Sequence, residues 1–290
     1  MSKDIKKNAK IVDIFLKKYF KNQKYSGLIS PMKYGTLTGG KKIRSTIILN
    51  VAKIFKLKTS KVINTCAAVE CIHSYSLIHD DLPCMDNDYL RRGKAATHIK
   101  FGESTAILAG NSLLTLAFEI ITDKRYKIKP NIKIFLLKKI AEYAGHTGIA
   151  GGQFLDLSYE KRKISISNII NMQKKKTGKL FQFCCLAPAI ISGAGKKATR
   201  EMSVIGEEVG FLFQIADDLL DIKGSKKHVG KPVKKDKRKG KSTLIKSLGY
   251  KKTLEFALRR KKTIMSKLKK YGNRSNELIR TLDFILNRSY

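Results

Sequence analysis

Apolar residues recur at helical spacing along almost the whole chain, and the alternating pattern typical of strands is absent. Only five residues are proline, so few positions interrupt a helix. Residues 61–78 and 105–121 are apolar almost all round, which predicts central helices. The pattern predicts an all-α fold: an amphipathic helix over 4–20, a loop with Gly35, Gly39 and Gly40, and helices over 43–55, 61–82, 104–122, 131–155, 166–191, 197–222, 243–270 and 275–288.

Neither a repeat nor a linker divides the chain, so we expect residues 1–290 to form a single domain. The most interrupted stretch is Lys223–Lys241, where we expect a solvated loop or part of a binding site. No uncharged apolar run reaches the length of a membrane span, about 18 residues, and Met1–Lys10 lacks the apolar core of a secretion signal. The five cysteines form no CxxC pair, which fits a reducing compartment. We therefore expect a cytoplasmic protein without a transmembrane segment.

Lysine dominates the charge of the chain, which has 60 basic and 23 acidic residues and a formal net charge of +37. Such a charge raises nucleic acid or an acidic membrane surface as a partner. However, only 12 of the basic residues are arginine, the side chain best suited to reading guanine, and the lysines are scattered along the whole chain. A basic anion- or nucleic-acid-binding protein is an alternative interpretation, but we expect no nucleic-acid partner.

Six of the scarce acids fall in two clusters within apolar segments, namely Asp80, Asp81 and Asp86, and Asp217, Asp218 and Asp221. Clustered carboxylates in apolar surroundings repel one another and are costly to bury unless a cation neutralises them. The first cluster ends the predicted helix 61–82, where the helix dipole also disfavours negative charge. On the predicted helix 197–222, Gln214, Asp217 and Asp221 follow one another at steps of three and four residues, on one stripe. Mg²⁺ is commonly bound by one or two carboxylates plus substrate phosphates, and the clusters predict such a site.

Basic motifs accompany the acids. Gly39–Arg44 runs a flexible turn into the start of a helix, which is a natural anion site because backbone N–H groups and the helix dipole both favour negative charge. Arg91-Arg92-Gly93 follows the first acid cluster, and Lys176-Thr177-Gly178 and Gly240–Thr243 offer further phosphate-sized sites. Neither of the last two is a P-loop. Together with two magnesium-type clusters, these motifs predict a pocket for two diphosphates.

These residues make the chain resemble the polyprenyl (isoprenyl) diphosphate synthase family, most closely its bacterial farnesyl-forming members. The order of the paired acid clusters, with RRG after the first, is highly specific. Departures are modest: Asn87, Tyr89 and Asn111 stand where related sequences often carry acids. The matching blocks span nearly the whole chain: GGKKIR (39–44), VECIHSYSLIHDDLPCMDND (69–88), LRRGK (90–94), FGESTAILAG (101–110), GGQFLDL (151–157), KTGKL (176–180), FQIADDLLDIKG (213–224) and GKST (240–243).

The resemblance implies an isoprenoid synthase fold, with about ten helices around a central cavity, as a homodimer. It implies a short-chain trans-prenyltransferase that condenses isopentenyl diphosphate with dimethylallyl and geranyl diphosphate to give farnesyl diphosphate. The six acids would hold roughly three Mg²⁺ ions against the allylic diphosphate. The allylic diphosphate would also contact Arg91, Lys176, Thr177, Gln214, Lys231 and Lys241, with Lys176 assisting catalysis. Isopentenyl diphosphate would contact Lys41, Arg44, His73 and Arg92. The released diphosphate would take up the final proton.

Product length is expected from Tyr75 and from the four residues between Asp81 and Asp86. The resemblance implies that this combination gives a farnesyl product, with the Tyr75 ring closing the floor of the chain tunnel. Five helical residues rise ~7.5 Å, which suits a short prenyl tail, although Tyr75 lies roughly 140° from Asp80 on an ideal wheel. Tyr75 could equally be a core tyrosine. A geranylgeranyl or longer-chain synthase is therefore the alternative within the family. A regulatory subunit without activity is disfavoured because no motif acid is missing, and a terpene cyclase because the second cluster is DDLLD.

Overall fold

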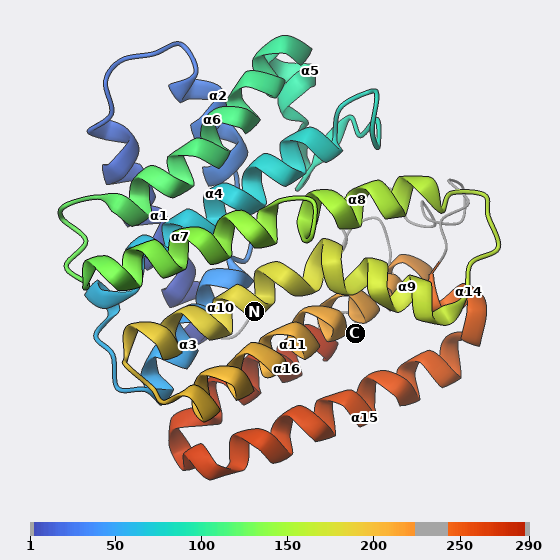
Figure 1. The fold of residues 1–290 in the computed structure, drawn as a ribbon. Coiled ribbons are helices and arrows are strands. Elements are labelled where there is room, and N and C mark those ends of the chain that lie inside the picture. Colours follow the sequence, from blue (N-terminus) through green and yellow to red (C-terminus); the bar gives the residue numbers. More distant parts are fainter. Residues whose placement is uncertain (1–2, 224–242, 288–290) are drawn as a thin grey trace.

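Helices form nearly all of the regular structure in this computed structural model, which describes residues 3–223 and 243–287 without the side chains of residues 222 and 223 (Figure 1). The fold is all-α, as the sequence predicts. In chain order the helices are α1 (Lys3–Lys21), α2 (Ile29–Leu37), α3 (Ile43–Ile54), α4 (Ile63–Asp80), α5 (Thr97–Phe101), α6 (Glu103–Thr122), α7 (Pro130–Ala144), α8 (Ile149–Ser158), α9 (Ile166–Gln173), α10 (Lys179–Ile191), α11 (Lys196–Lys223), α14 (Leu244–Leu248), α15 (Tyr250–Leu268) and α16 (Asn276–Asn287).

Two pairs of helices form the centre of the molecule: α4 packs along α6, and α10 packs along α11 (Figure 1). Helix α3 links the pairs, because it contacts both α4 and α10. Ile47, Ile72, Leu113, Phe181 and Phe211 are fully buried where these helices meet. Burying each such side chain contributes about 1.5–3 kcal/mol, so this apolar core fixes the helices whose ends carry the acid clusters.

Several predicted boundaries were wrong. Helix α2 occupies residues assigned to the loop before Gly39. The predicted helix 131–155 is divided, because α7 ends at Ala144 and α8 begins at Ile149. A Cβ atom at Gly148 would lie 1.9 Å from the Tyr143 carbonyl oxygen, so only glycine fits this sharp turn. The predicted helix 243–270 likewise breaks at Gly249, which has a φ of 77°.

Two short elements were also missed. The strands β1 (Leu90–Arg91) and β2 (Lys94–Ala95) form an antiparallel hairpin with Leu90 opposite Ala95. Arg92 and Gly93 turn the chain between them, both with positive φ, as a two-residue hairpin requires. Strands of two residues are too short to show an alternating pattern. In addition, α9 continues into α10 through a π-helical turn, η2 (Lys174–Gly178).

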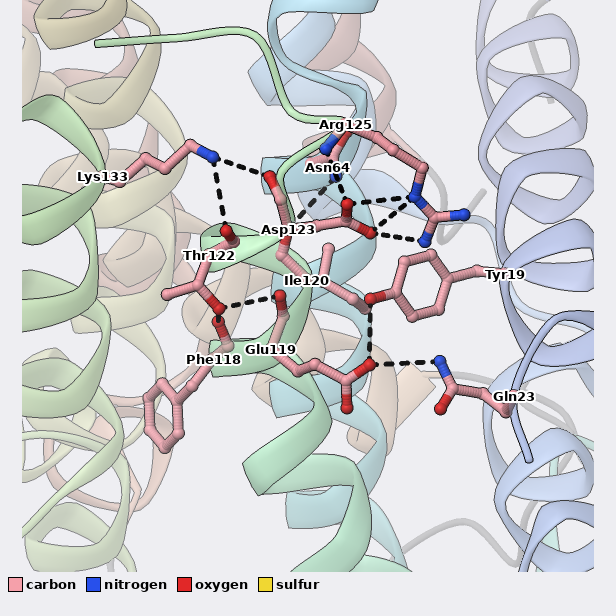
Figure 2. Close-up of polar contacts among 10 residues, drawn as sticks. All are labelled: Tyr19, Gln23, Asn64, Phe118, Glu119, Ile120, Thr122, Asp123, Arg125 and Lys133. Atoms are coloured by element: carbon pink, nitrogen blue, oxygen red, sulfur yellow. Dashed lines mark hydrogen bonds and ion pairs between the residues drawn. The ribbon is translucent and has the colours of Figure 1, made fainter. Parts of the chain in front are cut away.

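A polar cluster joins α1, α4 and α7 to the end of α6 (Figure 2). Glu119 accepts hydrogen bonds at 3.2 Å from both the Tyr19 hydroxyl and the Gln23 amide, and burial raises the pKa of Tyr19. Asn64 of α4 donates to the Ile120 carbonyl oxygen at 3.1 Å. Figure 2 also shows Arg125 donating hydrogen bonds to the Asp123 carboxylate, and Lys133 donating to the backbone carbonyl oxygens of Thr122 and Asp123. These contacts satisfy the exposed carbonyl end of α6 and fix its position in the bundle.

By length and composition, α6 is the one helix among the described residues that could cross a membrane. Core helices of soluble proteins pass the same test. The packing of α6 along α4, with Ala106, Ala109, Leu113 and Ala117 buried between them, is that of a core helix. The absence of a transmembrane segment stays a prediction.

Candidate active site

A cleft of about 350 Å³ brings together nine of the side chains that the sequence singles out. Its walls come from the C-terminal half of α4, the hairpin, α8, the π-helical turn and α11, with one residue from the start of α3. The lining residues are Arg44, His73, Ser76, Leu77, Asp80, Arg91, Arg92, Ile149, Gln153, Lys176, Thr177, Phe213, Gln214 and Asp217. The cleft therefore carries acids and bases from segments far apart in the sequence.

In the first acid cluster, one carboxylate faces the cleft and the next one is buried behind the cleft surface. Asp80, the last residue of α4, lines the cleft. Asp81 is only 2% exposed and accepts a hydrogen bond from Arg91 Nε at 2.9 Å and a second one from Arg91 Nη2. The chain then folds back, so that the Asp86 amide donates to the Asp80 carbonyl oxygen at 2.8 Å. This turn brings the backbone of the third acid next to that of the first.

The second cluster repeats this division on α11. Asp217 lines the cleft, whereas Asp218 is 4% exposed. Asp218 accepts hydrogen bonds from Gln214 Nε2 at 2.9 Å and from Gln173 Nε2 at 2.8 Å. The Thr177 hydroxyl in turn donates to Gln214 Oε1 at 2.9 Å. In each Asp-Asp pair, the first carboxylate faces the cleft and the second one holds a cleft-lining donor in place.

Two residues of α8 that the sequence reasoning missed belong to this site. Asp156 accepts a hydrogen bond from Lys176 Nζ at 2.6 Å, which orients the ammonium group. Gln153 lines the cleft, and among the described residues neither of its buried amide atoms has a hydrogen-bond partner. A Cβ atom at Gly152 would lie 2.2 Å from the Lys176 amide nitrogen, so glycine permits this close approach to the π-helical turn. The available signal was GGQFLDL itself, with two polar residues three apart in an apolar segment.

Arg44 and His73 form the wall that α3 and α4 contribute. Arg44 Nη1 lies 3.2 Å from His73 Nε2, and the guanidinium lies over the Phe181 ring at 4.7 Å and the Phe213 ring at 5.6 Å. Burial holds the pKa of His73 well below 6.5, and the positive charges of Arg44 and Arg92 lower it further. A neutral His73 accepts the Arg44 hydrogen bond at Nε2 and carries its own proton at Nδ1.

This shift predicts a pH effect on stability. The folded-state pKa of His73 lies below its unfolded value of about 6.5, so below that pH the unfolded chain binds a proton that the folded chain excludes. The free energy of unfolding should therefore fall as the pH decreases from 7.5 to 5.5, and the fall should be smaller in His73→Gln. Urea unfolding at both pH values measures this difference. The same pH dependence in both proteins would contradict the assignment.

Besides Asp81 and Asp218, six further predicted residues lie outside the cleft lining or outside the described residues. Lys231 and Lys241 fall in the segment that the structure does not describe. Asp86 and Asp221 are half-buried near the cleft acids, and Lys41 Nζ lies 5.0 Å from the centre of the Phe284 ring. Tyr75 is 9% exposed, its hydroxyl donates to the Ala144 carbonyl oxygen at 3.3 Å, and burial raises its pKa to about 12, with the Asp80 charge adding to the shift. Its ring meets the His79 ring edge-on.

The donor set fits magnesium held together with a substrate. Among the described residues, no group of three His, Cys, Asp or Glu side chains forms a metal cluster by itself. Mg²⁺ is typically bound by one or two carboxylates and completes its shell with phosphate oxygens and water. Asp80 and Asp217 line one cleft from two different helices, and bases surround them. Phosphate oxygens of a bound compound could complete the shell of an ion held there.

Comparisons with known proteins agree with this geometry. Residues 26–281 match the model of the polyprenyl synthetase family. The farnesyl diphosphate synthase of Geobacillus stearothermophilus is 41% identical over 229 residues, which are 78% of this chain and 77% of that protein. The structure resembles an FPP/GFPP synthase from Zymomonas mobilis, with a TM-score of 0.87, 30% identity and coverage of 99% and 100% of the two chains. It also resembles a Helicobacter pylori geranyltransferase complexed with magnesium and isoprenyl diphosphate, with a TM-score of 0.82, 26% identity and coverage of 99% and 97%. The chain belongs to the polyprenyl synthetase family.

Proposed function

We propose that this protein is a short-chain trans-prenyltransferase that condenses isopentenyl diphosphate with dimethylallyl and geranyl diphosphate to give farnesyl diphosphate. The observation that carries this proposal is the single cleft with Asp80 and Asp217 on different walls and basic side chains around them. The 41% identity to a bacterial farnesyl diphosphate synthase supports the same reaction. The FPP/GFPP synthase among the structural neighbours keeps a longer product as the alternative.

Asp80 and Asp217 are the carboxylates we expect to hold Mg²⁺ directly, with Asp86 and Asp221 beside them. The ions, when bound, would offset the negative charge that develops on the departing diphosphate. Asp81 and Asp218, also among the predicted ligands, are tied to Arg91 and to Gln173 and Gln214. We expect them to act mainly by holding these donors in place. The Helicobacter pylori neighbour, complexed with magnesium and isoprenyl diphosphate, supports the choice of metal; the number of ions stays a prediction.

Side chains beside both acid clusters would bind the allylic substrate. Arg91, Lys176 and Gln214 present N–H donors that are fixed before the reaction begins, and Thr177 lies beside them with its hydroxyl donating to Gln214. Preorganised donors of this kind stabilise a leaving diphosphate as its bond to the allylic carbon breaks and the electron pair departs with it. Lys231 and Lys241 are proposed to assist from the segment that the structure does not describe.

Isopentenyl diphosphate would bind to Arg44, His73, Arg92 and Lys41. Neutral His73 adds no charge of its own, so the attraction comes from the two guanidinium groups and the ammonium of Lys41. The double bond of this substrate would attack the allylic cation. The proton lost from the new chain would pass to the released diphosphate. Leu77, Ile149 and Phe213 line the cleft and would exclude water from the cation.

We also propose a homodimer in the cytoplasm. Helix α6 exposes Ile107 and Leu108, although its opposite side is core, and neighbouring α5 exposes Ile99. A second copy that covers these side chains would remove their apolar surface from water. Sedimentation of Leu108→Lys beside the parent protein would show whether this face makes the dimer.

Tyr75→Ala is expected to lengthen the product. If the ring ends the space for the growing chain, its removal should give C20 and longer products while condensation continues. Tyr75→Phe is the matched control, because it keeps the ring and loses only the hydrogen bond to Ala144. Chromatography of the dephosphorylated products measures the effect. An unchanged C15 profile from active Tyr75→Ala would show that another residue sets the length.

The experiment that tests the proposed function is a condensation assay with radiolabelled isopentenyl diphosphate, Mg²⁺ and each allylic primer in turn. A C15 product from dimethylallyl and geranyl diphosphate is expected. A product of C20 or longer would favour the alternative within the family. If no primer gave condensation, the enzyme proposal would be wrong. The alternative of a basic nucleic-acid-binding protein would then be tested by measuring whether binding to nucleic acid weakens with salt.

A further inference from the structure

A buried lysine stands in the sequence between Lys41 and Arg44, two residues that we propose bind isopentenyl diphosphate. Lys42 is 4% exposed, and its Nζ donates a 2.6 Å hydrogen bond to the Thr36 carbonyl oxygen of α2. The same ammonium lies 3.6 Å from Glu70 Oε2 of α4 and 3.7 Å from Asp13 Oδ1 of α1. Lysine is almost never fully buried unless it is paired. Lys42 therefore ties three helices to the start of a fourth, α3.

Its partner Glu70 holds the first turn of α3. Glu70 is 1% exposed, and its Oε1 accepts hydrogen bonds from the Ser45 amide at 3.3 Å and from the Ser45 hydroxyl at 2.7 Å. The Ser45 amide belongs to the first helical turn, where N–H groups have no partner within the helix. A carboxylate at this end is also favoured by the helix dipole. Glu70 thus fixes the position of the helix start from which Arg44 projects.

The backbone of Lys42 needs this support. Lys42 has a φ of 47° and a ψ of 44°, a left-handed conformation that side-chain-bearing residues adopt at a cost. Gly39 and Gly40 before it also have positive φ, and the Gly39 carbonyl oxygen accepts from Arg92 Nη1 at 2.9 Å. Three left-handed residues in four make a turn that would relax if the Lys42 side chain were not bound. Lys41 and Arg44 would then move with it.

We propose that Lys42 and Glu70 are positioning residues for isopentenyl diphosphate: their buried pair fixes the turn and the first helical turn that present Lys41 and Arg44. This inference rests on the proposed function. Lys42 and Glu70 are both buried and neither lines the cleft, so we place them behind the groups that bind the substrate. A displacement of 1 Å can cost about a hundredfold in such sites, so the pair should set affinity for one substrate and not the other.

The test compares Lys42→Met, Glu70→Gln and the double variant with the parent protein. Each should raise KM for isopentenyl diphosphate at least about tenfold, with KM for geranyl diphosphate and kcat changed less than about threefold. The double variant leaves no buried ion pair half-broken, so it separates lost positioning from an uncompensated charge. Lys42→Arg, which keeps charge and donors, should restore KM to within about threefold of the parent.

A matched control lies at the other end of the same helix. Lys53 forms an ion pair with Glu277 at 2.6 Å, but its side chain is exposed, so Lys53→Met should leave every kinetic parameter unchanged. Circular dichroism checks that each variant is folded, and parent activity is measured first, so a failure of the proposed function is recognised separately. Equal changes in KM for both substrates, or an unchanged KM in the folded double variant, would overturn the positioning role.

Discussion

Asp217→Ala should lower kcat at least about a thousandfold, because it removes the carboxylate of the second wall that faces the cleft. Without it, a Mg²⁺ ion bound beside the allylic diphosphate would lose a ligand on α11 and would offset less of the negative charge on the leaving group. The fold should survive, since Asp217 lines a cleft and does not fill the apolar core. Chelation of metal by EDTA should abolish parent activity, and added Mg²⁺ should restore it.

The control for this variant is Glu201→Ala on the same helix. Glu201 pairs with Lys270 far from the cleft lining, so its loss should leave kcat within about twofold. Steady-state rates with geranyl and isopentenyl diphosphate at several Mg²⁺ concentrations measure both variants. Normal condensation by Asp217→Ala at low Mg²⁺ would remove the role assigned to the second acid cluster.

Arg44→Ala should raise KM for isopentenyl diphosphate about a hundredfold and change KM for geranyl diphosphate little. The guanidinium is held between His73 and the rings of Phe181 and Phe213, so it is already oriented for a diphosphate. Lys176→Ala should show the reverse preference, because Lys176 is held by Asp156 on the other wall. Initial rates with each substrate varied in turn give both constants.

Arg274→Ala serves as the control for Arg44, since Arg274 donates to the Ile54 carbonyl oxygen at the opposite end of α3. The loss of this hydrogen bond should lower the stability of the protein. It should not change KM for isopentenyl diphosphate relative to KM for geranyl diphosphate. If Arg44→Ala instead weakens both substrates equally, the cleft does not hold two distinct diphosphate sites, and the division of its bases would have to be abandoned.

The sequence predicted the helices and most of the cleft because both depend on local spacing. Asp80 sits at the end of an apolar helix, and Gln214 and Asp217 share one stripe of another, so their placement follows from helix geometry. The basic residues near glycines, Arg92 and Lys176, were found by the same local signals. Nine of the predicted side chains line one cleft, and His73 among them was predicted from the family resemblance alone.

What the sequence could not predict depends on contacts between distant segments. The hydrogen bonds from Arg91 to Asp81 and from Gln173 to Asp218 form only after the chain has folded. The sequence alone therefore could not distinguish these buried acids from the acids that face the cleft. The left-handed backbone of Lys42 has no local signal, and Glu70, one of the partners of its buried side chain, lies 28 residues away in the sequence. The break between α7 and α8 likewise depends on how closely Gly148 approaches Tyr143.

The central claim is that acids on two walls act on one allylic diphosphate, and metal anomalous scattering tests it most directly. Crystals grown with Mn²⁺ and the thio analogue of geranyl diphosphate, whose C–S bond resists ionisation, would show where the metal sits. We expect Mn²⁺ between the diphosphate and Asp80 on α4, and between the diphosphate and Asp217 on α11. A bound analogue with Mn²⁺ on neither carboxylate, or on one wall alone, would contradict it.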